Sequence, residues 1–114
     1  MTETMTTAYV TAPQAAADGL ARRLVDERLA ACVNVVPCDS VYRWGDEIHE
    51  DEESILLAKT AEDRYDDLRA AMIEWHPHDV PCIERFDAAD AHDPFASWCV
   101  SAVQKAGKEN GDGS

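Results

Sequence analysis

The feature that most constrains the fold is a pair of long β-rich segments separated by only two residues. The first spans residues 31–44 and the second spans residues 47–59, with Gly45-Asp46 between them. A connection this short joins neighbouring antiparallel strands. We therefore expect a long, bent hairpin. Pro37 interrupts the first segment, which predicts a bulge or an edge strand at that point.

Apolar spacing and capping residues predict five more elements around the hairpin. The resulting order is strand, helix, strand, strand, helix, strand and a terminal helix, which is the ferredoxin-like βαββαβ arrangement of the α+β class. Two helices would cover one face of the sheet and leave the other face bare. A second copy of a chain this small is then the expected cover. The five elements are a strand at 7–11, a helix from Pro13 to Val25, a helix from the Thr60–Asp63 cap to Trp75, a strand at 80–86 and a helix at 93–103.

The length of 114 residues predicts one domain with a small core. We assign residues 1–104 to this domain. Residues 105–114 are polar and rich in glycine, and nothing in them can pack against a core, so we expect a disordered tail.

The chain is strongly acidic, with 23 acidic and 10 basic residues and a formal net charge of −13. Such a surface repels nucleic acid and anionic lipid, which excludes both as expected partners. Two interpretations of the acidity remain: a surface adapted to a salt-rich, halophilic cytoplasm, or a local site that gathers cations. The charges are spread along the whole chain, which favours the first.

Cysteine usage and the absence of targeting segments predict a cytoplasmic protein. No two of the four cysteines are spaced as C-x-x-C, so no zinc-ribbon or thioredoxin-type motif is present. No leader pattern and no apolar run near 18 residues occurs. We expect reduced thiols at all four positions, Cys32, Cys38, Cys82 and Cys99.

The segment from Trp75 to Glu84 concentrates side chains that bind late first-row metals. Its candidates are His76, His78, Cys82 and Glu84. On a strand Cys82 and Glu84 would share one face, with both histidines at its entrance. An imidazole–thiolate set suits copper or zinc, and Cu(II) binds most strongly among divalent ions. The alternative is structural: His76-Pro77 ends the helix, Cys82 is a small buried residue and Glu84 is a surface charge.

Three further features admit both a functional and a structural interpretation. Trp75 and Trp98 fit core packing, whereas Trp44 at the hairpin tip fits a ligand cleft or a contact with a neighbouring subunit. Lys59 either binds an anion or pairs with a carboxylate. Residues 51–53 either hold a hard cation weakly or form a solvated strand face. His49 and His92 each stand alone in acidic surroundings, and we interpret both as surface residues. Since no glycine elbow or phosphate-binding loop is present, we expect no enzymatic activity.

Several segments together resemble the CutA family of divalent-cation tolerance proteins. The resemblance runs from about Tyr9 to Val103. It implies a ferredoxin-like subunit, a homotrimer similar in plan to PII signalling proteins, and binding of divalent metal, above all copper. No enzymatic reaction is established for the family as a class. The matching segments are Leu29–Asn34 with Pro37, Ser40–Tyr42 with Trp44, Glu50–Glu53 leading to Leu57–Thr60, His76-Pro77 with Val80-Pro81, and the Phe95–Trp98 helix.

The chain departs from the family pattern at three positions. His78 and Cys82 stand where relatives usually carry tyrosine and glutamate, and Val10 stands where some relatives have a cysteine taken as a copper ligand. A metal site here would therefore differ from theirs. Two hypotheses follow: a cytoplasmic trimeric copper-binding protein acting in metal tolerance, or a PII-like trimeric module that binds a small ligand or a protein partner in clefts between subunits.

Overall fold

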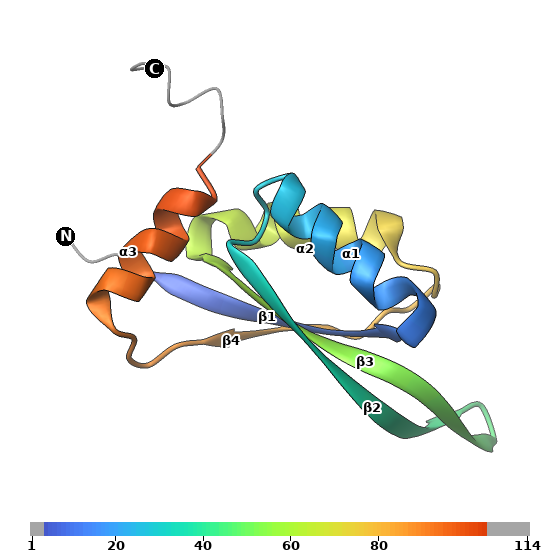
Figure 1. Cartoon of the computed structure of the whole chain (residues 1–114). Coiled ribbons are helices and arrows are strands. Elements are labelled where there is room, and N and C mark those ends of the chain that lie inside the picture. The colour runs from blue at the N-terminus through green and yellow to red at the C-terminus, as the bar shows by residue number, and fades with distance from the viewer. Residues whose placement is uncertain (1–3, 105–114) are drawn as a thin grey trace.

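A computed structural model of the chain describes residues 4–104, which form a four-stranded antiparallel sheet and three α-helices (Figure 1). The strand order is β2-β3-β1-β4. This is the predicted ferredoxin-like α+β arrangement with an additional terminal helix. The expected tail at residues 105–114 lies outside the described residues. The elements are β1 (Met5–Pro13), α1 (Gln14–Asp26), β2 (Cys32–Trp44), β3 (Glu47–Ala61), a 3-10 turn (Glu62–Arg64), α2 (Tyr65–Trp75), β4 (Ile83–Asp87) and α3 (Asp93–Ala102).

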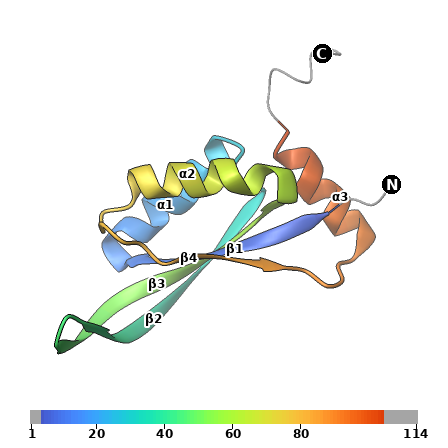
Figure 2. The same cartoon turned by 180° about the vertical axis from the view of Figure 1, so that it is seen from behind.

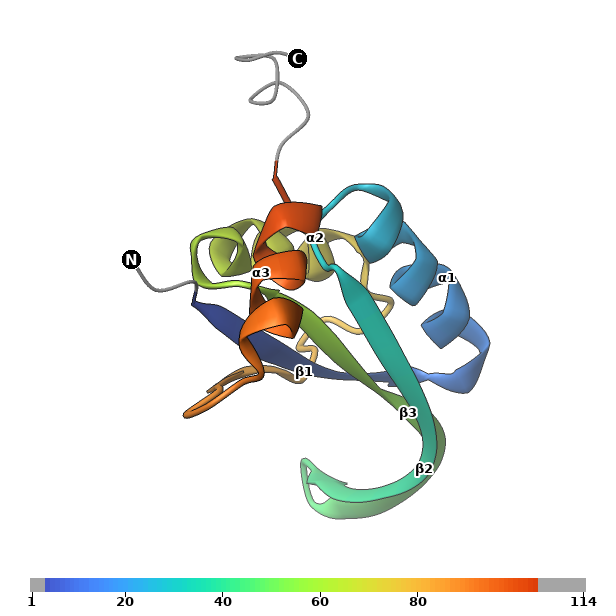
Figure 3. The same ribbon diagram turned by 60° about the vertical axis from the view of Figure 1, so that its left-hand side comes forward.

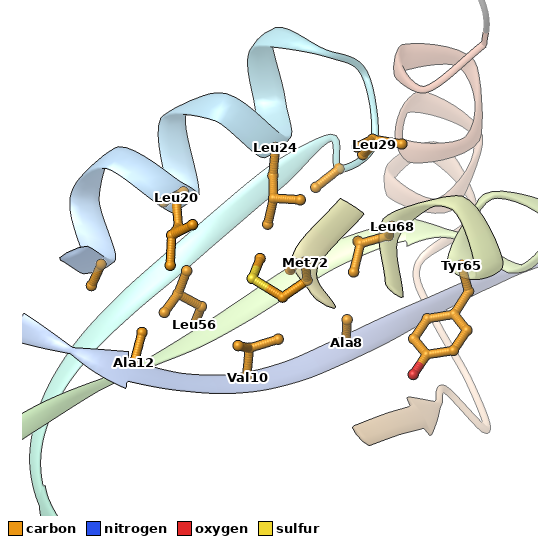
Figure 4. Close-up of a cluster of buried hydrophobic side chains, with 14 residues drawn as sticks. Ala8, Val10, Ala12, Leu20, Leu24, Leu29, Leu56, Tyr65, Leu68 and Met72 are labelled. Atoms are coloured by element: carbon orange, nitrogen blue, oxygen red, sulfur yellow. The ribbon is translucent and has the colours of Figure 1, made fainter. Parts of the chain in front are cut away.

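Helices α1 and α2 lie side by side on one face of the sheet (Figures 1 and 2). Alternate residues of a strand point to opposite faces, and Ala8, Val10 and Ala12 of β1 point toward the helices. They pack there with Leu24 and Met72 in the main hydrophobic core (Figure 4). The predicted apolar stripe of α2 is confirmed, since its members line this core: Tyr65, Leu68, Met72 and the partly buried Trp75.

The opposite side of the sheet, here called the open face, carries the remaining residues of β1, including Thr7, Tyr9 and Thr11. Helix α3 covers only one end of it, where Met5 packs against Ala96 and Cys99 in a second, smaller cluster. Elsewhere large apolar side chains are exposed, including Val36 and Phe86 on the open face and Trp98 on α3. The prediction that Trp98 packs in the core is wrong, because α3 turns this residue outward.

The β2–β3 hairpin has close to the predicted length and is more regular than predicted. Its ladder runs without interruption from the pair Cys32–Lys59 to the pair Trp44–Glu47, so Pro37 makes no bulge. Pro37 is tolerated because β2 is an edge strand, where a missing N–H is not needed by a neighbour. Residues 38–53, here called the hairpin arm, project past the helices and curve (Figure 3). They contribute to the largest dimension of the molecule, 54 Å.

Three predicted boundaries differ from the structure. Pro13 ends β1 in an extended conformation, and α1 begins one residue later. Thr60 is not a helix cap; it lies within β3, and its hydroxyl is buried without a hydrogen-bond partner among residues 4–104. Strand β4 begins at Ile83 rather than at residue 80. Cys82 therefore lies just before the strand, at the end of the connection from α2.

A charged network attaches the end of β4 to β1. The Thr6 hydroxyl donates a hydrogen bond to Oδ1 of Asp87 at 2.7 Å, and Arg85 Nε donates to the same oxygen at 2.6 Å. The hydrogen bond from Arg85 and then that from Thr6 lower the pKa of Asp87 below its ordinary value. Arg85 also forms an ion pair with Glu62 at 3.3 Å, which links β4 to the start of α2.

Candidate functional site

A pocket of about 680 Å³ lies between the hairpin arm and the connection from α2 to β4. The arm contributes one wall, which includes Tyr42, Trp44, His49 and Glu53. The connection contributes the other, here called the 77–82 loop, which includes His78 and Cys82. The pocket thus joins segments far apart in the chain, and it contains the family-like His-Pro region that the sequence singled out.

His76 sets the position of the 77–82 loop. Its backbone is extended, as expected before Pro77, and its N–H closes the last turn of α2 on the Met72 carbonyl at 2.9 Å. Its side chain is buried, with 7% of the residue exposed. The backbone N–H of His78 donates to Nδ1 at 3.0 Å, so the ring proton lies on Nε2, which donates to the Thr11 carbonyl at 2.8 Å.

Both nitrogens of His76 are therefore occupied, and neither is free for a metal in this conformation. The residue acts instead as a bridge between the end of α2 and β1. Because it fixes the start of the 77–82 loop, it also holds His78, whose ring centre lies 5.1 Å from its own. Of the four predicted metal ligands, His76 is the one whose donor atoms the fold already uses.

The other three predicted ligands are divided between the pocket and the open face. His78 and Cys82 both line the pocket, whereas Glu84 lies within β4 opposite Tyr9. Within residues 4–104, no group of three His, Cys, Asp or Glu side chains is arranged to hold a metal ion. One subunit therefore brings two of the four candidates to one cavity but does not assemble the set.

Tyr9 lies at the centre of the acidic groups on the open face. Burial is the largest cause that raises its pKa, and the neighbouring Cys82, Cys38, Glu84 and Glu53 raise it further. Groups that can carry negative charge on both walls of the pocket, Glu53 on the arm and Cys82 on the 77–82 loop, thus raise the pKa of the Tyr9 hydroxyl. Val10 beside it is fully buried against the helices. A cysteine at that position would therefore point into the core of this chain, away from the pocket.

Trp44 and Lys59 lie in different surroundings. The Trp44 side chain lines the pocket and is largely exposed, which suits either of its predicted roles. Lys59 donates a hydrogen bond from Nζ to Asn34 Oδ1 at 2.6 Å. Its predicted ion pair with a carboxylate is absent from the described part of the chain. Lys59 also acts on Cys99, whose pKa burial raises to about 11 despite the opposing charge of the lysine.

Sequence reasoning assigned two residues of the pocket wall to the solvent-exposed surface. It interpreted His49 as an isolated surface residue and Glu53 as part of a solvated strand face, yet both line the cavity. The signal was present in the two-residue turn, because it fixes the register of the hairpin and places His49 opposite Tyr42. Their rings stack with centres 5.5 Å apart. What the register alone does not reveal is the curvature that turns this face toward the 77–82 loop.

Comparison with known proteins identifies the family. The model of the CutA1 divalent ion tolerance protein matches residues 6–102. The chain belongs to this family. CutA of Pyrococcus horikoshii, a divalent-cation tolerance protein, is 35% identical over 98 residues, which cover 85% of this chain and 96% of the relative. The protein of the same name from Thermus thermophilus is 41% identical over 80 residues, which cover 69% of this chain and 78% of the relative.

Solved CutA1 structures share the fold of the described residues. The protein from Ehrlichia chaffeensis superposes with a TM-score of 0.85 at 29% identity and covers 91% of this chain and 99% of its own. CutA1 from Oryza sativa gives a TM-score of 0.86 at 32% identity and covers 92% and 98%. The predicted family and fold are confirmed, and membership associates the chain with divalent-cation tolerance. No helix among the described residues is long and apolar enough to span a bilayer.

Proposed function

We propose that this CutA-family chain is a cytoplasmic homotrimer that binds divalent metal, Cu(II) in preference to other ions, and contributes to metal tolerance without catalysing a reaction. The observation that carries the proposal is the pairing of one imidazole and one thiol, His78 and Cys82, on the same pocket of a divalent-cation tolerance protein. Nitrogen and sulfur donors select copper and zinc over hard ions, and copper binds more strongly than zinc at a given site.

The metal site of this proposal is completed by self-association. Copper and zinc sites in proteins use three or four ligands, and one subunit brings only two of the predicted ones to the pocket. Exposed apolar side chains on the arm and on the open face, among them Trp44, Ile48, Val36 and Phe86, support burial against identical copies. A neighbouring copy would then supply the remaining donors. Glu84 is the candidate for this role among the predicted ligands, because it is exposed on the open face of the sheet.

Calorimetric titration of chelator-treated protein with Cu(II) and Zn(II) tests the site. We expect His78→Ala and Cys82→Ser each to weaken Cu(II) binding by about tenfold or more, as is usual when one ligand is lost. His92→Ala is the matched control, because His92 is exposed and lies outside the pocket. Equal, weak and multi-site binding by all four proteins would refute the assigned ligands.

Light scattering tests the proposed trimer. It should give about three times the 12.6 kDa chain mass, and a folded monomer would refute the assembly.

The alternative function is a PII-like module whose clefts bind a small ligand or a protein partner. The observation that favours it is the pocket itself, whose volume of about 680 Å³ lies in the range of small-molecule sites and far exceeds that of a metal ion. If His78→Ala and Cys82→Ser lose metal binding but bind a ligand in this pocket as the wild type does, ligand binding is separate from metal tolerance.

A further inference from the structure

We propose that His76 is a positioning residue for the pocket: one of its ring nitrogens directs His78 toward the cavity, and the other keeps Cys82 out of the β-sheet. The inference deepens the proposed function and rests on it where metal affinity is concerned. The placement of the two residues, however, is a property of the metal-free protein, so it can be measured separately. His76 itself contacts no metal in this role.

The first contact closes a turn at the start of the 77–82 loop. The backbone N–H of His78 donates to Nδ1 of His76 at 3.0 Å, across Pro77. In Asx-turns the side-chain oxygen of asparagine or aspartate accepts the same bond, from the N–H two residues further on. The imidazole nitrogen takes that place here. Because the backbone N–H of His76 is bonded to the last turn of α2 and Pro77 has a fixed φ, this turn sets the direction in which the chain leaves the helix.

The second contact lies where the β1–β4 ladder ends. In an antiparallel ladder the N–H and C=O of one residue point to the same neighbouring strand, and successive residues alternate between the two neighbours. The Glu62 N–H donates to the Thr4 carbonyl at 3.2 Å, so the even-numbered residues of β1 bond toward β3 and the odd-numbered ones toward β4. The Thr11 carbonyl therefore points toward β4, one residue beyond the last pair of that ladder, Val10–Ile83.

The imidazole occupies the acceptor that a longer β4 would use. In a ladder one residue longer, the Cys82 N–H would donate to the Thr11 carbonyl. His76 Nε2 donates to this carbonyl at 2.8 Å instead, and β4 begins only at Ile83. Cys82 is exposed and lines the pocket. The ring that places His78 thus also competes with the backbone of Cys82 for one acceptor and keeps this residue in the loop.

Two conservative substitutions separate the two contacts. His76→Asn places an oxygen near the position of Nδ1, so it keeps the turn and loses the donor to Thr11. His76→Gln carries its amide nitrogen one carbon farther out, near the position of Nε2, so it keeps that donor and loses the turn. Each variant loses one hydrogen bond, and the two should unfold at similar temperatures. If the histidine had only a structural role, the two variants would be equivalent in every measurement.

Residue-resolved hydrogen–deuterium exchange of the full-length, chelator-treated protein tests the placement. We expect His76→Gln to accelerate exchange at the His78 amide by about fivefold or more and to leave the Cys82 amide unchanged. His76→Asn should slow exchange at the Cys82 amide by about the same factor, because this N–H can then join the ladder, and leave the His78 amide unchanged. The proposal is overturned if either variant fails to change its own amide or if both variants change the same one.

His92→Gln and His92→Asn are the matched controls, because His92 is exposed and lies outside the pocket. At both amides they should exchange as the wild type does. A change of equal size in these controls would overturn the proposal, since it would show that the effect does not depend on position 76.

Calorimetric titration with Cu(II) tests the consequence for the proposed function. Both His76 variants should bind at least about tenfold more weakly than the wild type, as is usual when a residue that orients a ligand is replaced. The His92 variants should bind as the wild type does. Unchanged affinity in the His76 variants would overturn the positioning role in metal binding. If the wild type itself binds no Cu(II), the proposed function fails, whereas the exchange pattern still decides whether His76 places the two residues.

Discussion

Replacing His76 by alanine should destabilise the metal-free protein, because this side chain joins the end of α2 to β1. The change removes the hydrogen bonds of Nε2 to Thr11 and of Nδ1 to His78. Each is worth about 1 kcal/mol. The imidazole is also buried, and loss of its packing adds roughly 1 kcal/mol. The expected decrease in the free energy of unfolding is therefore about 3 kcal/mol.

Thermal unfolding followed by circular dichroism measures this loss. For a domain of about 100 residues, 1 kcal/mol corresponds to roughly 4–8 °C, so a loss of about 3 kcal/mol should lower the midpoint by about 12–24 °C. All proteins must be compared at one concentration, because self-association raises the apparent stability. His76→Asn should lose about half as much, since its amide oxygen can still accept the His78 N–H. His92→Ala, at an exposed position, is the control and should unfold with the wild type.

The outcome distinguishes a structural histidine from a metal ligand. If His76 were only a metal ligand, its replacement would leave the stability of the metal-free protein unchanged. It would reduce only the stability gained on adding Cu(II). If metal-free His76→Ala unfolds within about 2 °C of the wild type, the two hydrogen bonds contribute little and the reasoning fails. A decrease that appears only with metal present would return His76 to the set of ligands.

Four further predictions concern other parts of the fold. Gly19 lies in α1, where an added methyl group would meet only open space, so Gly19→Ala should stabilise the protein by about 1 kcal/mol in urea unfolding. Gly45→Ala should destabilise it by a similar amount, because Gly45 has a φ of +66°; a destabilised Gly19→Ala would contradict the first prediction and a stabilised Gly45→Ala the second. The pKa of Asp87 is lowered in the folded state, so its stabilising effect is present above its unfolded pKa and is lost as pH falls through the folded pKa. Asp87→Asn should therefore flatten the acid end of the stability profile, and an unchanged profile would show that its hydrogen bonds do not matter. Burial raises the pKa of Cys99 to about 11, whereas Cys82 is exposed, so a thiol reagent at a pH of about 8 should label Cys82 first and Cys99 only on unfolding; mass spectrometry that finds early labelling of Cys99 would contradict this order.

The predictable part of the fold rests on local patterns. The two-residue turn at Gly45-Asp46 specifies the hairpin, and the apolar stripe from Tyr65 to Trp75 specifies α2. Both were predicted and both occur. The errors occur where contacts with other elements determine which side chains are buried. Trp98 has an apolar context in the sequence, but α3 packs through Cys99 and leaves Trp98 exposed. An apolar stripe on a helix does not specify how many of its side chains the neighbouring elements can cover.

The candidate site was predictable in part. His-Pro at the end of a helix and the neighbouring His78 and Cys82 are visible in the sequence, and the last two do lie in one cavity. The acceptor for His76 is not visible, because Thr11 lies 65 residues away and contributes only a backbone carbonyl, which every residue has. The burial of Glu53 is equally hidden, since the residues before it in the sequence are acidic and exposed.

The amino-acid order alone determined which segments become strands and helices, because periodicity and turn length are local properties. The order of the motifs along the sequence also indicated the family. Only the tertiary structure decided which histidine nitrogens are already bonded, which glutamate is buried in the pocket wall and which surfaces meet across the pocket. Those properties depend on contacts between distant segments, and the curvature of the hairpin arm sets the most important of them.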